Sequence, residues 1–400
     1  MSETLWSTDG EGIVIDGEPI DTSGCIVTPG LVNAHHHLMQ TAFRTLPATR
    51  GVPMREWLPA MAAAYASAGI DGSLTYAAAR AGVAEALLCG VTTVADHQLN
   101  WGDADPLETA SGTVRAAREL GGRLVFVRGT AGDSAALAAS GAEAIVSEFA
   151  PNGVSHDGMV QVAVGPAGVH SDRRETFDAL REVAIRHGLR RRTQANEQVD
   201  TAIALERYGL RPLELLDEWG WLEPGTTIAH LCDVTPDEIA LLAERGVSAT
   251  HAPGCDVPMG WGVAPLARML AAGITVGLGT SGGGSNDAGH LLADARLAMQ
   301  VSGLIGEPLS ARQVLTAATA GGAAGLGRPE LASGEDLCVW DVSGVADAGV
   351  ADPVAGLLWA SPGRRPRHVI VAGRVVVRDY RLVTADEAEI TAALRARVGR

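Results

Sequence analysis

The amino-acid sequence predicts an α/β fold: a (β/α)8 TIM-like barrel with a small β-sandwich domain built from both termini. From about residue 31 to residue 330, short β-branched or apolar runs alternate with longer stretches of helical period, as in βα units around a parallel sheet. Eight such units in about 300 residues match the size of a closed barrel. The two ends of the chain instead carry strand-like segments without helical partners.

The barrel prediction depends on the eight apolar runs and on the helices between them. The expected strands are residues 31–37, 91–97, 123–128, 160–165, 189–197, 226–231, 247–251 and 275–280. The clearest helices are residues 74–89, 174–187, 236–245 and 264–272. In a closed barrel, the active site lies at the carboxyl ends of the strands. An open, doubly wound sheet is the alternative arrangement of the same units.

The domain boundaries follow from the same pattern. Residues 29–330 are expected to form the barrel, whereas residues 1–28 and 331–383 together form the small terminal β domain. Its strand-like segments are GIVIDGEPI near the start, and DLCVWDV and HVIVAGRVVVRDYRLV near the end. Residues 384–400 are expected to pack as a closing C-terminal helix, because their apolar residues have helical spacing.

The charge of the chain excludes several classes of partner. The 400 residues include 31 Lys+Arg and 47 Asp+Glu, so the formal net charge is −16. Nucleic acids and anionic membrane surfaces would be approached against a repulsive field, so neither is expected as a partner. The sequence contains no lysine, which excludes chemistry that needs a Schiff-base or Walker lysine.

Composition and cysteine usage indicate a cytoplasmic globular protein. Hydrophobic residues make up 46% of the chain and charged residues 20%, as in a protein with a packed core. The five cysteines are scattered without a CxxC pair, which fits a reducing compartment. The first residues, MSETLWSTDGEG, are polar and acidic, unlike a signal peptide, and no stretch is apolar enough to span a membrane.

Histidines carry the strongest chemical signal. Of the 11 histidines, five stand at the carboxyl ends of four expected strands and one follows a fifth: His35, His37, His97, His230 and His251, and then His170. Residues two apart on a strand point to the same side, so His35 and His37 face the barrel mouth together while His36 faces away. Two neutral imidazoles on a rigid strand suit Zn²⁺ or Fe²⁺.

Several motifs, taken in order, resemble one enzyme family. VTPGLVNAHHHLMQTAFR resembles the first barrel strand of the amidohydrolase superfamily, in the branch that contains 8-oxoguanine, cytosine and guanine deaminases and triazine chlorohydrolases. The similarity continues through GVTTVADH, IAHLCDVTPDEI, APLARMLAAGITVGLGT, SNDAGHLLADARLAM, LTAATAGGAAGLG and HVIVAGRVVVRDYRLV. The resemblance implies a hydrolytic deaminase of an N-heteroaromatic small molecule such as an aminopurine, pterin or triazine.

The resemblance also implies site residues, but the sequence departs from the family pattern at two positions. The fifth-strand metal ligand, a histidine in the family, falls on Gln194, and the aspartate after the eighth strand falls on Ser281. An amide oxygen is a weaker ligand than imidazole, and a hydroxyl lacks the charge and basicity of a carboxylate. Two interpretations therefore stay open.

In the first interpretation, the protein is a deaminase with one divalent metal, Zn²⁺ or Fe²⁺. The metal ligands are then His35, His37, His230 and, as a weak or outer ligand, Gln194. Glu197, which matches the family's proton-transferring glutamate, activates water and protonates the leaving group. His230 positions the water or the developing oxyanion, and Ser281 supplies a hydrogen bond where an aspartate would act.

In the second interpretation, the metal is absent, and the barrel mouth performs metal-free lyase or isomerase chemistry or only binds a ligand. A relocated site for a soft metal is a further alternative, because His251 with Cys255 and His230 with Cys232 stand near neighbouring strand ends. The metal content of the purified protein discriminates between the two interpretations.

The candidate substrate-binding residues lie where this branch of the family surrounds its heterocycle. They are Gln40, Trp57, His97, His170 and His251. An aromatic side chain with amide donors suits a flat ring, although ordinary helix packing also explains Trp57. The resemblance further suggests a homodimer.

Overall fold

Eight parallel strands form a closed barrel in the computed structural model, which describes residues 13–15, 18–361 and 363–399. The barrel strands are β4 (Leu31–His37), β5 (Val91–Gln98), β6 (Arg123–Thr130), β7 (Val160–Pro166), β8 (Arg190–Ala195), β9 (Thr226–His230), β10 (Ser248–His251) and β11 (Val276–Leu278). Each strand pairs with the next in sequence order, and β11 pairs with β4 through Leu278 and Asn33. This last pairing confirms the predicted barrel and excludes the open sheet.

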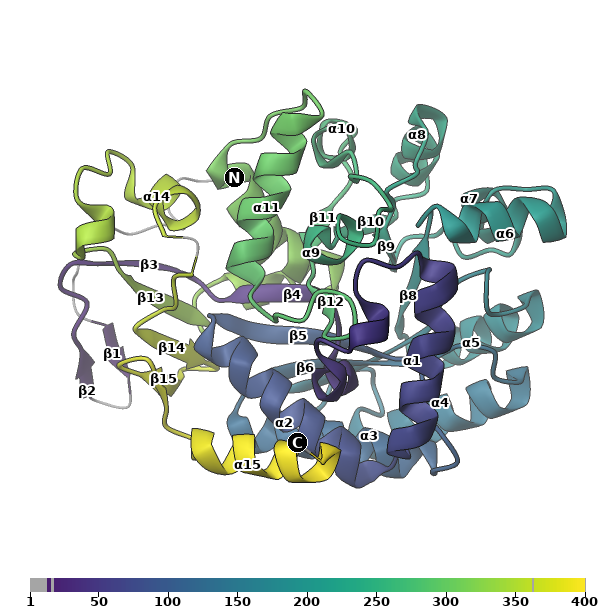
Figure 1. Cartoon of the computed structure of the whole chain (residues 1–400), viewed down its shortest axis with the longest axis horizontal. Coiled ribbons are helices and arrows are strands. Elements are labelled where there is room, and N and C mark those ends of the chain that lie inside the picture. Colours follow the sequence, from purple (N-terminus) through teal and green to yellow (C-terminus); the bar gives the residue numbers. More distant parts are fainter. Residues whose placement is uncertain (1–12, 16–17, 362, 400) are drawn as a thin grey trace.

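Helices surround the barrel (Figure 1). They are α1 (Met54–Ala68), α2 (Gly72–Leu88), α3 (Pro106–Leu120), α4 (Ala135–Phe149), α5 (Arg174–His187), α6 (Val199–Tyr208), α7 (Pro212–Glu218), α8 (Pro236–Glu244), α9 (Pro253–Asp256), α10 (Leu266–Ala271), α11 (Leu291–Leu304), α12 (Ala311–Thr316) and α13 (Gly322–Gly325). Short turns of helix are η2 (Leu38–Phe43), η3 (Pro47–Thr49), η4 (Ala317–Gly321), η5 (Pro329–Ala332) and η6 (Val345–Asp347).

Two barrel strands end two residues earlier than the sequence predicts, and the run at 226–231 ends one residue earlier, at His230. The run at 189–197 stops as a strand at Ala195, and the next two residues begin a loop. The run at 275–280 forms only β11, followed by the short strand β12 (Ser281–Gly282), which pairs with the end of β4. The first correction places Glu197 in a loop at the barrel mouth, and the second places Ser281 in a short strand beside the end of β4.

The seam between the first and last barrel strands is held by side chains as well as by the backbone. Asn33 donates from Nδ2 to Thr280 Oγ1 at 2.7 Å and accepts the Thr280 N–H at 3.1 Å. Thr280 Oγ1 also lies 2.8 Å from His36 Nδ1, so the middle histidine of the triplet is engaged in the seam. Gly279 permits this close approach, because a Cβ there would lie 2.6 Å from the His35 carbonyl oxygen.

The terminal segments form antiparallel sheets at the end of the barrel opposite the mouth (Figure 1). One sheet has the order β16 (Arg381–Leu382), β15 (Arg374–Arg378), β14 (His368–Val371), β13 (Leu337–Asp341) and β3 (Cys25–Pro29). A hairpin of β1 (Ile13–Ile15) and β2 (Glu18–Ile20) packs on it through a cluster that includes Ile20, Cys25 and Val339. The predicted small β-sandwich is thus a five-stranded sheet with a hairpin, while residues 1–12 and 16–17 lie outside the described residues.

Two helices accompany these sheets. Helix α14 (Pro353–Trp359) was not predicted from the strand-like terminal segment, and it begins with Asp352 accepting the N–H groups of Val354 and Ala355. Helix α15 (Glu387–Val398) runs along α2 (Figure 1), where Arg80 pairs with Glu389 at 3.0 Å. Helix α15 therefore packs on the outer face of the barrel.

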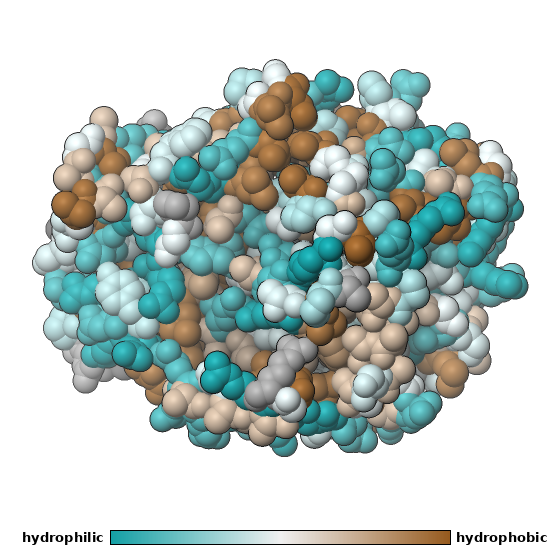
Figure 2. All heavy atoms as spheres, viewed as in Figure 1, coloured by the Kyte–Doolittle hydropathy of each residue, from teal (hydrophilic) through white to brown (hydrophobic). Residues whose placement is uncertain are grey.

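The face shown in Figure 2 carries hydrophilic side chains around smaller groups of apolar ones. Apolar atoms gather over the end of α11, where Leu304 and Ile305 are exposed. Among the described helices, none combines the length and hydropathy needed to cross a membrane.

A buried ion pair joins the barrel to the terminal sheet, and it predicts a large stability effect. Arg123, the first residue of β6, donates to Asp336 from Nε at 2.8 Å and from Nη2 at 3.0 Å, and Asp336 is fully buried. We predict that Asp336→Ala lowers the free energy of unfolding by about 3–5 kcal/mol, because a buried guanidinium loses its carboxylate. Urea denaturation measures this loss.

Glu335→Ala is the matched control, because Glu335 lies 3.8 Å from the same guanidinium but its side chain is 83% exposed. The control variant should lose less than about 1 kcal/mol. Equal losses in the two variants would contradict the assignment of the buried pair as the stabilising contact.

Candidate active site

Two histidines of β4 form the base of the candidate site. The rings of His35 and His37 are 4.9 Å apart, and His35 Nε2 is buried without a hydrogen-bond partner. His37 Nδ1 lies 2.7 Å from the carbonyl oxygen of His97. Because a carbonyl only accepts, Nδ1 of His37 carries the hydrogen and Nε2 keeps its lone pair. Burial lowers the pKa of His37 to about 4, so the ring is in the neutral form that can bind a metal.

Gln194 and Glu197 bring two further polar groups to the site from the end of β8. The Gln194 amide donates to the Ala167 carbonyl at 3.3 Å, which turns its Oε1 to within 3.1 Å of His230 Nε2. Glu197 Oε1 lies 3.6 Å from the same nitrogen. The Glu197 side chain is buried and its Oε2 has no hydrogen-bond partner. Burial raises the pKa of Glu197 to about 8.

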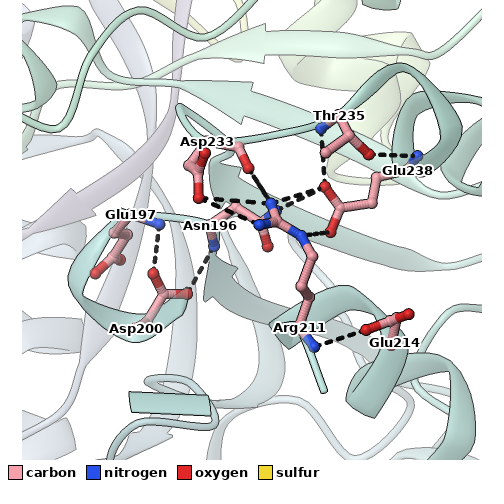
Figure 3. Close-up of polar contacts among 8 residues, drawn as sticks. All are labelled: Asn196, Glu197, Asp200, Arg211, Glu214, Asp233, Thr235 and Glu238. Carbon is pink, nitrogen blue, oxygen red and sulfur yellow. Dashed lines mark hydrogen bonds and ion pairs between the residues drawn. The ribbon is translucent and has the colours of Figure 1, made fainter. Parts of the chain in front are cut away.

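The loop after β8 holds Glu197 between two residues with strained backbone. Asn196 and Gln198, on either side of Glu197, have φ angles of 56° and 81°, which non-glycine residues rarely adopt. Asp200 compensates by accepting the N–H of Asn196 at 2.7 Å and the N–H of Glu197 at 2.6 Å (Figure 3). The position of Glu197 therefore depends on the carboxylate three residues later.

A second network ties this loop to the loop after β9. The side chain of Asn196 donates to the Asp233 carbonyl at 3.0 Å and to Glu238 Oε2 at 3.1 Å. Figure 3 shows the Arg211 guanidinium beside Asn196, and its Nε donates to Glu238 Oε1 at 2.8 Å. Glu238 also accepts the N–H of Thr235 at 2.8 Å, which starts helix α8 with a capping box. Helix capping and loop anchoring thus share one carboxylate.

His230 lies at the end of β9, with Gln194 and Glu197 facing its Nε2 and Asp256 facing its Nδ1. Its Nδ1 is 2.6 Å from Asp256 Oδ1, and Asp256 Oδ2 is 3.0 Å from His251 Nδ1. Burial alone would lower the pKa of His230, but the charge and hydrogen bond of Asp256 raise it above the usual value. Burial alone would raise the pKa of Asp256, and His230 and His251 instead bring it well below the usual range.

A cavity of about 550 Å³ opens above these groups. Its polar lining includes His37, Gln40, His170, Gln194, Glu197 and Ser281. Its apolar wall includes Met54, Trp57, Leu58, Met61, Met259 and Trp261. The size suits one small heterocyclic molecule, and the aromatic and thioether wall suits a flat ring. Trp57 donates to the Gly284 carbonyl at 2.9 Å, so its indole is fixed against the loop after β12.

Three of the five predicted substrate-binding residues line the cavity: Gln40, Trp57 and His170. His97 and His251 do not line the cavity: His97 Nε2 is engaged with the Gly165 carbonyl at 2.8 Å, and His251 contacts Asp256. His230, Cys255 and Asp256 form a group whose ligand atoms lie within 4.8 Å of one another. In that group, both oxygens of Asp256 already contact imidazoles, so a soft metal there would have to displace these hydrogen bonds.

The residues present fit a divalent cation. The ring of His35 lies 5.1 Å from that of His230 and 4.9 Å from that of His37, so His35 lies next to both of the other imidazoles. His35 Nε2 is a buried nitrogen without a hydrogen-bond partner, and Gln194 Oε1 and Glu197 Oε1 both face His230 Nε2. These acceptors require positive charge between them, which a bound cation or a proton on Nε2 supplies.

Sequence reasoning missed four buried residues of the site. Asp200, Asp256 and Asp96 are carboxylates, and Arg192 is a guanidinium that donates to the Ala34 carbonyl. Asp96 accepts the Leu38 N–H at 2.8 Å and so holds the chain just after His37. The spacing of Asp200 three residues after Glu197 is a local signal, whereas nothing in the sequence indicates the contact between Asp256 and His230.

Comparisons with known proteins agree with this geometry. Residues 26–376 match the amidohydrolase family. The chain belongs to this family. It is 32% identical to 8-oxoguanine deaminase of Pseudomonas aeruginosa, over 94% of this chain and 87% of that one. It is 34% identical to 5-methylthioadenosine/S-adenosylhomocysteine deaminase of Natronomonas pharaonis, over 92% and 85% of the two chains.

A solved structure extends the comparison. The atrazine chlorohydrolase from Arthrobacter aurescens, complexed with zinc, superposes with a TM-score of 0.89 at 32% identity, over 98% of this amidohydrolase and 94% of that chain. The family and this zinc-complexed relative support a divalent metal in the amidohydrolase described here.

The role of Asp200 can be tested without a substrate. We predict that Asp200→Ala speeds amide hydrogen exchange at Asn196 and Glu197 by about tenfold or more, because two N–H groups lose a charged acceptor. Hydrogen-exchange mass spectrometry of the loop peptide measures the change. Glu206→Ala, an exposed carboxylate on the same helix α6, should leave exchange unchanged; similar rates in both variants would exclude the anchoring role.

Proposed function

We propose that this amidohydrolase is a hydrolytic deaminase of a small N-heteroaromatic molecule such as an aminopurine, pterin or triazine. The observation that carries the proposal is Glu197, a buried carboxylate with a free oxygen that lines the cavity beside His230. A carboxylate in that position can move a proton between water and a leaving group. The deaminase relatives support the substrate class.

The residues divide the reaction between them. Water adds to the ring carbon that bears the amine, the bond from that carbon to the amine nitrogen breaks, and ammonia leaves. Glu197 takes one proton from water and delivers it to the departing nitrogen, while the ring nitrogen receives the other. His230 holds the water or the developing oxyanion, and Ser281 donates a hydrogen bond from its place in the cavity lining.

His35, His37 and His230 would hold the cation, with Gln194 as a weak ligand. When bound, a divalent cation supplies a Lewis acid that makes water nucleophilic near neutral pH. We propose zinc, because imidazole nitrogen is one of its common ligands and the zinc-complexed relative shares the fold.

A second candidate function is a metal-free reaction by Glu197 and His230, or binding of a ligand without turnover. The observation that favours it is the 3.1 Å contact between Gln194 Oε1 and His230 Nε2. If His230 carries a hydrogen on Nε2, it donates a hydrogen bond to Gln194 Oε1 directly, and no cation is needed between the two side chains. The two candidates differ in their response to chelation.

Replacement of Glu197 tests the proton transfer. We predict that Glu197→Gln lowers ammonia release by about 10²–10⁴-fold, because general acid–base catalysis is lost while the shape of the side chain is kept. Ammonia is measured over a panel of aminopurines, pterins and aminotriazines, and the melting temperature is measured in parallel. Glu206→Gln is the surface control. Full activity in Glu197→Gln with a native melting curve would refute the assigned role.

Metal content tests the histidine ligands. We predict about one zinc ion per chain in the purified protein and much less in His35→Ala, because a mononuclear site needs three protein ligands. Elemental analysis after dialysis measures the content. His36→Asn changes the adjacent residue, whose Nδ1 faces Thr280, and should keep the zinc. If chelation leaves ammonia release unchanged, the metal-free candidate is favoured.

A further inference from the structure

Asp256 is a buried carboxylate that contacts two imidazoles from neighbouring strands. It ends the short helix α9 after β10, and its side chain is fully buried. Asp256 Oδ1 lies 2.6 Å from Nδ1 of His230, and Oδ2 lies 3.0 Å from Nδ1 of His251. Each carboxylate oxygen is therefore committed to one ring.

This arrangement decides which nitrogen each ring presents to its surroundings. Carboxylate oxygens accept hydrogen bonds and do not donate them, so Nδ1 of both His230 and His251 must carry a hydrogen. His230 then presents Nε2 to Gln194 Oε1 at 3.1 Å and to Glu197 Oε1 at 3.6 Å. Without the carboxylate, nothing among these contacts prevents the ring from turning its other nitrogen toward Glu197.

The backbone at His230 is in a conformation that needs support from surrounding contacts. His230 and Leu231 have φ angles of 75° and 58°, in the left-handed region that non-glycine residues rarely occupy. Such conformations persist where surrounding contacts enforce them. The ring is held by Asp256 at Nδ1 and by Trp261, whose ring lies 5.0 Å away at 88°.

We propose that Asp256 is the positioning residue of this site, acting on His230 through a His–Asp–His chain. His251 completes the chain by engaging the second carboxylate oxygen, which keeps the first oxygen directed at His230. His251 Nε2 is buried without a partner, so its hydrogen bond to Asp256 is its polar contact among the described residues. The proposal rests on the proposed deaminase function only for the measurements of kcat, because the spectra and the zinc titration need no substrate.

The isosteric variant D256N gives the sharpest test. An amide has one accepting oxygen and one donating nitrogen, so it can accept from only one of the two rings. The other ring must then accept from the amide and move its hydrogen to Nε2. We expect long-range ¹H–¹⁵N spectra of histidine-labelled protein to show Nδ1 protonated in both rings of the wild type and in one ring of D256N.

Turnover and metal affinity should change with the tautomer. Loss of a hydrogen-bond partner behind a ligand or catalytic imidazole costs about 10–100-fold in metal affinity or activity. We therefore expect kcat of D256N, and its affinity for Zn²⁺ alone, to fall by about this factor. The double variant D256N/H251L leaves the amide oxygen free for His230, so Nδ1 protonation of His230 and kcat should return to the level of H251L alone.

Asp294 provides a matched control, because it is also a buried carboxylate but its hydrogen bonds among the described residues involve no imidazole. It accepts the Gly254 N–H at 2.8 Å and the Asn286 amide at 3.1 Å. D294N should leave the imidazole spectra of His230 and His251 unchanged.

Retention of Nδ1 protonation by both rings in D256N, or failure of the double variant to restore His230, would overturn the proposal. Absence of ammonia release from the wild type would refute the proposed deaminase function alone, since the spectra and zinc titration decide the role of Asp256 without a substrate.

Discussion

Closure of the parallel sheet between β4 and β11 is the contact on which the rest of the molecule depends. It brings His35 and His37 from the first barrel strand beside Ser281 from the segment after the last one. In an open sheet these residues would stand at opposite edges. The close approach requires a backbone without a Cβ at Gly279 and is completed by the Asn33–Thr280 hydrogen bonds. One seam thus creates both the barrel and the floor of its cavity.

Charge balance governs the chemistry at the barrel mouth. The carboxylate of Asp256 contacts Nδ1 of His230 from the neighbouring loop, and Glu197 Oε1 lies 3.6 Å from Nε2 of the same ring. Arg192 adds a buried cation below the histidines, and burial lowers the pKa of its guanidinium to about 9. Acidic and basic side chains are thus buried together around the barrel mouth. Residues 196, 198, 230 and 281 have positive φ angles and lie at or just beyond the ends of strands, so strained backbone accompanies the functional side chains.

The barrel could be predicted because parallel strands are buried on both faces. Such strands appear in the sequence as continuous apolar runs, and β4, β5, β6 and β7 are buried throughout. Strand ends were predicted less well, because the runs continued into buried loop residues such as Asn196 and Thr280. Helix α14 was missed because seven residues next to prolines and glycines carry little helical periodicity.

The candidate site divides in the same way. The HxH spacing on a strand predicts a common direction for His35 and His37, and the family motifs point to Glu197 and His230. The structure brings these four side chains close together. Their partners were not accessible from sequence, because Asp256 is 26 residues from His230 and the two meet only when β9 and β10 lie side by side.

The sequence by itself determined the architecture, the family and the strand ends that carry histidines, since periodic apolar residues and short motifs are sufficient to predict those properties. Only the tertiary structure decided which nitrogen of each imidazole is free and which carboxylate holds it. Hydrogen-bond partners in a barrel mouth come from different strands, and their distances depend on how the whole cylinder closes.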